Sequence, residues 1–303
     1  MNYQIGYKGI SVEVIEYTKH PAKIMWDMLK QTWVDLHDTA YDCNSKLVKT
    51  FIEDSLAKRL NPVPQETILI QVIFKGISRV NLAQITRQRG WLFNSESQMP
   101  QHTNHNVIIP LSIVNSPYYE RAKKLIEDSQ KLYDDMTKGN ECKDTTNIPY
   151  QDARYMLLNG QTADIAASFD ITKFVSCCGM RLENNTHDEI NYLCRLTIKA
   201  LKDAINNDNE LDCLDKLVYN TILNSCDVFG ANRKVCTCYD AMFGNSFKRY
   251  PDANNYVTQA TNNCLFDYTK LAWYQELKRM YDEEPELLLP GEKEMIENWK
   301  YEK

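Results

Sequence analysis

Segments with strand-like and helix-like patterns alternate along the chain, but they lack the regular spacing of repeated strand–helix–strand units. The clearest strand patterns are residues 10–18 and 67–77, which are rich in β-branched side chains. The clearest helical spacing of apolar residues lies in residues 45–60 and 188–205. Because strands and helices do not follow one another in regular units, the pattern predicts an α+β fold rather than a doubly wound parallel sheet.

Proline, glycine and apolar spacing delimit the remaining expected elements. Further strands are expected at residues 107–113 and 164–169. Further helices are expected from Pro21 onward and at residues 78–89, 116–138, 149–158, 171–181, 210–223, 265–283 and 291–301. Residues 90–106 are polar and lack periodicity, so they are expected to form a long loop, and such loops in compact domains are often functional.

The composition is that of a globular, helix-rich protein. Of the 303 residues, 43% are hydrophobic and 25% are charged, and the 10 glycines and 10 prolines argue against a glycine-rich Rossmann domain or a turn-rich all-β domain. The net charge of −6 argues against a protein that binds nucleic-acid polymers, but it leaves room for a local anion pocket. Without a secretory signal or an apolar run of about 18 residues, the chain is expected to be cytoplasmic and not membrane-bound.

The 10 cysteines invite a metal-site interpretation, but their spacing does not support one. Cys177–Cys178 and Cys236–Cys238 lack the two intervening residues that let paired thiolates bind one zinc ion. His102 and His105 share a polar loop without a clear third ligand. We therefore expect reduced thiols and no metal site, while a metal or redox role of the cysteines stays an open alternative.

Three segments place arginines beside polar or helix-starting residues. The first joins Arg87-Gln88-Arg89 to residues 94–98, the second is Gln151-Asp152-Ala153-Arg154, and the third ends at Arg181 and is followed by residues 187–190. Guanidinium groups bind phosphate through two parallel hydrogen bonds, and nearby hydroxyl and backbone N–H groups complete an anion site. Each arginine alone is better explained by a solvated surface position, and Arg181 also by a favourable place at a helix end.

Together and in this order, the three segments resemble the signature of the flavin-dependent thymidylate synthase family. That signature is Arg-His-Arg, a spacer with Asn-Glu-x-Ser, and a closing Arg, which correspond here to residues 87–89, 94–97 and Met99. The family's Gln-Glu-x-Ala-Arg helix start is similar to residues 151–154, and a second family arginine follows at the spacing of Arg181. Its Ala-Gln-x-Glu-Ile motif is similar to Thr186-His187-Asp188-Glu189-Ile190, so the resemblance covers roughly residues 10–205.

The resemblance implies an α+β enzyme of known type. It implies a homotetramer with active sites shared between subunits, FAD as the bound cofactor, NADPH as the reductant and methylenetetrahydrofolate as the one-carbon donor. The substrate would be a pyrimidine deoxynucleotide that is modified at C5, as in the conversion of dUMP to dTMP. Residues 1–205 would form the family core, and residues 206–303 a mostly helical C-terminal extension of unassigned role.

The resemblance also implies roles for individual residues. Arg181 takes the position of the arginine that polarises the pyrimidine edge, where a cation lowers the cost of negative charge as C5 becomes nucleophilic. The residues expected to bind the substrate are Gln84, Arg87, Ser95, Glu96, Ser97, Gln98, Arg154 and Arg181. The residues expected to bind the cofactor are Arg87, Gln88, Arg89, Asp170, Thr172 and Ser176.

The sequence departs from the family pattern at several positions, including Asp170, Thr172 and Ser176, where the family has Asn, Arg and Asn and only the location carries over. Gln88 stands for the motif histidine, Met99 for the closing arginine, and Pro100 for the tyrosine often found next to it. These changes leave two alternatives open: hydroxymethylation of dUMP or dCMP on the same fold, and a non-catalytic nucleotide-binding or scaffold protein. Addition of a thiolate from Cys177 or Cys178 to C6 is a further possibility, although their apolar neighbours favour buried thiols.

Overall fold

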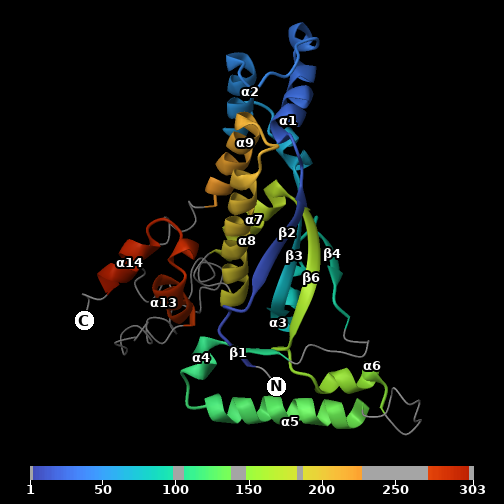
Figure 1. Ribbon diagram of the computed structural model, residues 1–303, viewed down its shortest axis with the longest axis vertical. Coiled ribbons are helices and arrows are strands. Elements are labelled where there is room, and N and C mark those ends of the chain that lie inside the picture. Colours follow the sequence, from blue (N-terminus) through green and yellow to red (C-terminus); the bar gives the residue numbers. More distant parts are fainter. Residues whose placement is uncertain (1–2, 98–105, 138–147, 183–186, 227–271, 300–303) are drawn as a thin grey trace, which may run out of the picture.

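The computed structural model describes residues 3–97, 106–137, 148–182, 187–226 and 272–299 (Figure 1). Its centre is an antiparallel sheet in the order β2-β3-β6-β4. The strands span Ser11–Tyr17 (β2), Leu69–Ser78 (β3), Thr162–Asp170 (β6) and Leu92–Ser95 (β4). A helix-bearing antiparallel sheet confirms the expected α+β class.

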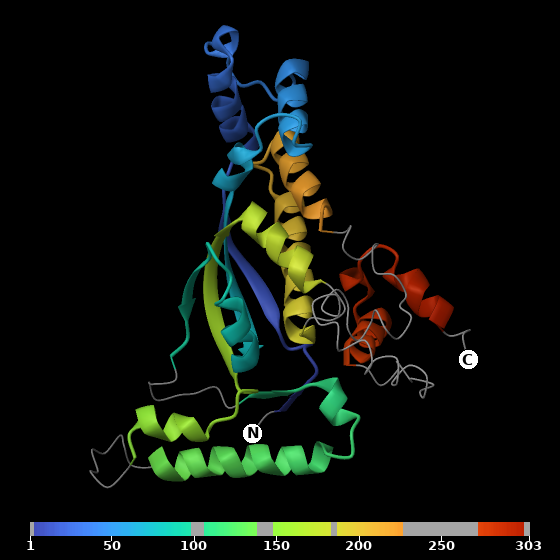
Figure 2. The same cartoon turned by 180° about the vertical axis from the view of Figure 1, so that it is seen from behind.

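Alternation of side chains along β3 and β6 determines which face of the sheet is buried. In β3, Ile70, Val72 and Phe74 are buried while Leu69 and Gln71 are exposed. The buried face is covered by α3 (Arg79–Ile85), α7 (Ile171–Arg181) and α8 (Asp188–Asn207), which pack against one another and the sheet (Figure 2). The core is therefore the interface between the sheet and these helices. Every second side chain of a strand and one apolar face of each helix point into it.

Three helices pack together at one end of the sheet, at the top of Figure 1. They are α1 (Pro21–Leu29), α2 (Lys46–Leu56) and α9 (Cys213–Asn224), and short 3-10 turns connect α1, α2 and β3. Those turns span Lys30–Thr32, Val34–Leu36 and Val63–Thr67. The buried residues of α9 belong to the same hydrophobic cluster as the sheet, so this helix extends the core beyond residue 205.

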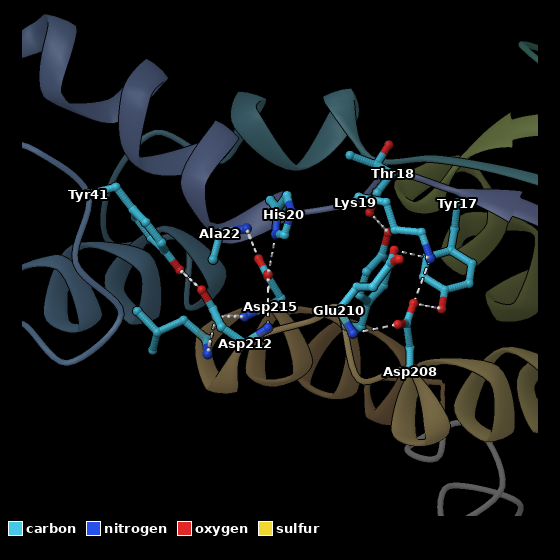
Figure 3. Close-up of polar contacts among 12 residues, drawn as sticks. Tyr17, Thr18, Lys19, His20, Ala22, Tyr41, Asp208, Glu210, Asp212 and Asp215 are labelled. Atoms are coloured by element: carbon cyan, nitrogen blue, oxygen red, sulfur yellow. Dashed lines mark hydrogen bonds and ion pairs between the residues drawn. The ribbon is translucent and has the colours of Figure 1, made fainter.

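Polar side chains join the turn between β2 and α1 to the turn between α8 and α9 (Figure 3). Asp208 accepts hydrogen bonds from Tyr17 at 2.5 Å and Lys19 at 2.6 Å. The fully buried Asp215 accepts one from the Ala22 N–H at 3.0 Å, and its other oxygen lies 3.2 Å from His20 Nδ1. These contacts hold the two turns together.

A second layer of helices lies at the other end of the sheet, at the bottom of Figure 1. It contains α4 (Leu111–Val114), α5 (Tyr119–Thr137), and α6 (Tyr150–Ala153) continued by a 3-10 turn over Arg154–Met156. Above it, β1 (Tyr3–Ile5) pairs in parallel with β5 (Val107–Ile109). This layer and the two short strands enclose a second, smaller hydrophobic cluster.

The C-terminal unit, residues 272–299, consists of α13 (Ala272–Glu283), a 3-10 turn (Pro285–Leu287) and α14 (Glu292–Trp299). It packs on α8 and α4. A buried ion pair links it to α8, because Arg195 donates to both carboxylate oxygens of Glu292, at 2.6 and 2.8 Å. The described part of the chain has no helix long and apolar enough to cross a membrane.

Several expected element bounds are wrong, and the causes are local. The helix expected over residues 78–89 ends at Ile85, and the strand expected over 107–113 ends at Ile109 because Pro110 is the N-cap of α4. The helix expected over 149–158 is one turn of α-helix and one of 3-10 helix. Strands β1 and β4 were not expected, because each is short and partly exposed and lacks a clear alternation.

Candidate active site

The loop between α3 and β4 lies against the start of α7. A side chain at Gly90, whose φ is +79°, would touch the side chain of Lys173 at 3.4 Å. The next residue, Trp91, stacks on Phe169 with ring centroids 4.1 Å apart and also contacts Phe174. Glycine at the left-handed turn and an aromatic anchor beside it therefore bring Arg87-Gln88-Arg89 to the first turn of α7.

The N-cap and first two turns of α7 hold the other three residues expected to bind a cofactor, which are Asp170, Thr172 and Ser176. The side chain of Asp170 caps the helix by accepting the Lys173 N–H at 2.9 Å, and it also accepts the Thr172 hydroxyl at 2.5 Å. One turn further, the Ser176 hydroxyl donates to the Thr172 carbonyl at 2.9 Å. The structure therefore brings the loop that follows Arg87-Gln88-Arg89 next to the start of α7, although the two elements are distant in sequence.

The charge of this site is positive. Arg87, Arg89 and Lys173 are exposed, and none of them forms an ion pair with another residue of the described ranges. Three unpaired cations beside a helix N-terminus form an arrangement that suits the diphosphate of a dinucleotide, although the Asp170 carboxylate already occupies part of the helix end. Gln88, half-buried in the same loop, adds an uncharged side chain.

A second group of expected residues gathers where β4 ends. Ser95 pairs with Ile165 of β6, and the next residue continues the contact, because the Glu96 N–H donates to the Asp164 carbonyl at 2.9 Å. The Asp164 N–H in turn donates to Glu96 Oε2 at 3.2 Å. This pairing fixes Ser95 and Glu96 at the sheet edge, with Ser97 directly after them, all three exposed to solvent.

Arg79, which the sequence did not single out, connects this second group to Arg154. Its Nη1 donates to the Glu96 carbonyl at 3.2 Å, and its buried Nε has no hydrogen-bond partner within the described residues. Burial lowers the pKa of Arg79, and the charge of Arg154 lowers this pKa further, while Glu96 raises it. Two neighbouring guanidinium groups with spare donors suit an anionic ligand such as a nucleotide phosphate.

Arg181 lies at the opposite end of α7 from Asp170. An α-helix rises about 1.5 Å per residue, so the 11 residues of α7 place Arg181 roughly 15 Å from the first turn. A single chain therefore does not bring Arg181 to the group around Arg87 and Arg89. Its charge acts instead on His187, whose pKa is lowered by burial and by the Arg181 guanidinium.

Helix α3 leads into the loop that carries Arg87, Gln88 and Arg89, here called the arginine loop. Gln84 is part of this helix, and Glu189 of α8 contacts its start. Gln84 lies half-buried on α3, one turn before Arg87. The buried carboxylate of Glu189 accepts the Ser78 N–H at 2.6 Å and also the Ser78 hydroxyl. The glutamate of the His187-Asp188-Glu189-Ile190 segment thus fixes the start of α3 against α8, and through α3 it orients the residues of the arginine loop.

The structure disfavours Cys177 and Cys178 as nucleophiles. Their side chains are 1% and 0% exposed. A hydrogen bond with Cys194 and burial raise the pKa of Cys177, and burial raises the pKa of Cys178, so both remain thiols at neutral pH. No group of cysteine, histidine and carboxylate side chains suitable for a metal ion occurs within the ranges the structure describes. Gln98, Met99, Pro100, His102, His105, Cys236 and Cys238 lie outside those ranges.

Comparison with known proteins identifies the family of the chain. The family model described as thymidylate synthase complementing protein matches residues 13–205. A UMP/dUMP methylase, PolB from Streptomyces cacaoi bound with 5-Br dUMP, is similar with 14% identity and a TM-score of 0.53 over 67% of this chain and 93% of that chain. The same methylase bound with 5-Br UMP gives 12% identity and a TM-score of 0.52 over 74% and 98%.

Thymidylate synthase X from Helicobacter pylori, solved with FAD and dUMP, shares 17% identity with a TM-score of 0.48 over 71% of this chain and 99% of that chain. No curated protein sequence matches significantly. Identities this low show a shared fold only, whereas the family model matches well over half of the chain. The chain therefore belongs to the thymidylate synthase complementing protein family, which confirms its resemblance to the flavin-dependent thymidylate synthases.

Proposed function

We propose that the protein is a flavin-dependent transferase that adds a one-carbon unit to C5 of a pyrimidine nucleotide. The observation that carries the proposal is the gathering of the Arg87-Gln88-Arg89 loop and the first turn of α7 into one cationic site, in a chain of this family. The similar fold of a protein named as a UMP/dUMP methylase supports a uridine nucleotide as the substrate.

The residues of the arginine loop fit FAD. Arg87, Arg89 and Lys173 would hold its diphosphate, and the hydroxyls of Thr172 and Ser176 would complete the polar lining. When bound, FAD supplies the redox chemistry that converts the transferred carbon to a methyl group. NADPH as its reductant and methylenetetrahydrofolate as the carbon donor are further parts of this proposal.

The residues around β4 and Arg154 would hold the nucleotide. Arg79 and Arg154 present guanidinium donors for the phosphate, and the ends of β4 and β6 keep Ser95 and Glu96 beside them. Arg181 would lie at the pyrimidine edge, where its positive charge stabilises the negative charge that the ring gains as C5 attacks the carbon donor. Its distance from the arginine loop along α7 supports an active site completed by neighbouring subunits of a homotetramer.

The test is the mass of the product. Purified protein is incubated with FAD, NADPH, methylenetetrahydrofolate and, separately, dUMP, UMP and dCMP, and the nucleotides are analysed by mass spectrometry. A methylated dUMP or UMP is the expected result. A product heavier by one further oxygen would assign the hydroxymethylase alternative, and absence of any product with every nucleotide would leave a binding or scaffold role and contradict the proposal.

Single substitutions test which residues bind the nucleotide and which stabilise the transition state. Arg154→Ala is expected to raise the KM for the nucleotide with little change in flavin binding, because Arg154, whose charge acts on Arg79, would hold the nucleotide phosphate and not the flavin. Arg181→Ala is expected to lower kcat by about 100-fold or more, the size of effect seen when one group that stabilises transition-state charge is removed. Arg121→Ala on α5, an exposed arginine with no expected role, is the matched control and should leave both constants unchanged.

A further inference from the structure

A cavity of about 300 Å³ lies between the lower end of the sheet and the helix layer below it. Its walls are mostly apolar and include Ile109 of β5, Ala122 and Ile126 of α5, and Leu158 in the turn before β6. It does not contain the residues of the arginine loop, the first turn of α7 or Arg154. Ser78 and Val80 line it on either side of Arg79 in the chain, so the cavity borders the proposed nucleotide site, but none of the residues proposed to bind the flavin or the nucleotide lines it.

The polar end of the cavity is formed by the starts of α3 and α8. Ser78 and Glu189 lie there but satisfy each other, because both the N–H and the hydroxyl of Ser78 donate to the Glu189 carboxylate. His187 also lines the cavity, and its Nδ1 is buried without a hydrogen-bond partner in the part of the chain that the structure describes. A buried polar atom without a partner costs free energy that a ligand would recover.

The charges around this end disfavour an ionic ligand. Glu189 lines the cavity with a carboxylate, which disfavours an anion. Arg181 acts electrostatically on His187 from the side of α7, which disfavours a cation there. Burial and Arg181 both lower the pKa of His187, so its ring is neutral at pH 7 and can either donate or accept one hydrogen bond.

We propose that this cavity binds a small neutral molecule with an apolar, ring-sized body and one hydrogen-bonding group that pairs with Nδ1 of His187. An apolar cavity with a few polar groups at one end is typical of small-molecule sites, and this volume is at the lower end of their range. A flavin or a nucleotide is larger and anionic, so the ligand class differs from those of the proposed reaction.

The first experiment compares three probes of one shape and different charge on the full-length protein. 4-Methylphenol is neutral at pH 7.5, 4-methylbenzoate is an anion and 4-methylbenzylamine is a cation. Calorimetric titration should show saturable binding of 4-methylphenol. The binding of both ions should be at least about tenfold weaker, because an ion loses its hydration without gaining a partner charge. No binding of 4-methylphenol, or equal binding of either ion, would overturn the proposal.

The second experiment locates the probe. Ala122→Phe fills the cavity from α5 and should abolish binding of 4-methylphenol, whereas Leu132→Phe, at an exposed position of the same helix outside the cavity, should leave it unchanged. Circular dichroism and thermal unfolding of both variants show whether they fold. If Ala122→Phe folds and still binds the probe with unchanged affinity, the cavity is not the site.

The third experiment tests the hydrogen bond. His187→Phe should weaken the binding of 4-methylphenol by about fivefold, which is the effect of losing one neutral hydrogen bond. The same variant should leave the binding of toluene unchanged. His187→Gln, which keeps a hydrogen-bonding group, should restore part of the affinity. Equal losses for toluene and 4-methylphenol would show that His187 only shapes the cavity, which contradicts the proposed pairing. None of these readouts depends on catalytic turnover, so failure here leaves the proposed function untouched.

Discussion

At the scale of single residues, a buried charge pair joins the C-terminal unit to the core. Arg195 of α8 is 2% exposed and Glu292 of α14 is 0% exposed, and two hydrogen bonds connect them. Removal of one partner leaves the other charge buried and unpaired, which typically costs about 3–5 kcal/mol. We expect Glu292→Ala to lower the free energy of unfolding by about that amount in a denaturant titration.

The matched control for that substitution is Glu294→Ala, at an exposed position of the same helix. Its effect should stay within about 0.5 kcal/mol, as is usual for surface positions. Equal, small effects of both substitutions would show that the Arg195–Glu292 pair does not hold the C-terminal unit.

A second residue-scale prediction concerns acid stability. Hydrogen bonds from Lys19 and Tyr17 lower the pKa of Asp208 in the folded protein. A carboxyl group whose folded pKa lies below its unfolded value of about 3.9 stabilises the fold above that pH, and this contribution is lost as the pH falls further. Asp208→Asn should therefore reduce stability at pH 7 and flatten the decline below about pH 4, measured as denaturation midpoints across pH. A parallel decline in both proteins would contradict this role of Asp208.

Some of the candidate site residues can be identified from the sequence, and others cannot. Arg87, Arg154 and Arg181 were identified because their order and spacing match a family signature. Arg79 was missed because it belongs to no signature segment, and only the fold brings it beside Glu96 and Arg154. Pairing across a sheet edge is a long-range contact that local sequence does not encode.

At the scale of elements, α7 was predictable and β4 was not. The start of α7 follows from Asp170 as a helix cap, which the structure shows as a hydrogen bond to the Lys173 N–H. In contrast, β4 has only four residues at the edge of the sheet, and Leu92, its first residue, is 74% exposed. Such a strand forms because β6 offers a partner, so its own sequence carries no alternation to detect.

The turn between α3 and β4 carries the element-scale prediction. Gly90 has a φ of +79°, and a Cβ there would also touch Lys173. Gly90→Ala is expected to cost about 1–2 kcal/mol of stability and to weaken FAD binding, because the strain displaces Arg87 and Arg89 from the first turn of α7. Gly90→Asn should cost less, since asparagine tolerates the left-handed region. Alanine and asparagine variants of equal stability and flavin affinity would contradict this account of the turn.

At the scale of the whole molecule, one chain separates Arg181 from the arginine loop by most of the length of α7. If neighbouring subunits complete each active site, two inactive variants should complement each other. We expect Arg87→Ala and Arg181→Ala homo-oligomers to be inactive, and mixed oligomers formed by co-expression to recover a fraction of the activity. Mixed oligomers without activity would place all catalytic residues of a site on one subunit.

The α+β class and the family were reachable from the sequence, because strand and helix patterns and the ordered arginine segments are local signals. The arrangement of the C-terminal unit was not, because it depends on Arg195 meeting Glu292 across nearly 100 residues. Whether residues 206–303 act as a separate extension stays a prediction, although α9 shares the core of the preceding residues.

The visible absorption spectrum of the purified, full-length protein tests the central claim most directly. If Arg87, Arg89, Lys173 and the first turn of α7 bind FAD, the protein should show the absorption bands of a bound flavin after addition of FAD and removal of the unbound excess. Arg87→Ala combined with Arg89→Ala should lose these bands without loss of thermal stability. A wild-type protein that remains colourless after this treatment would contradict the account.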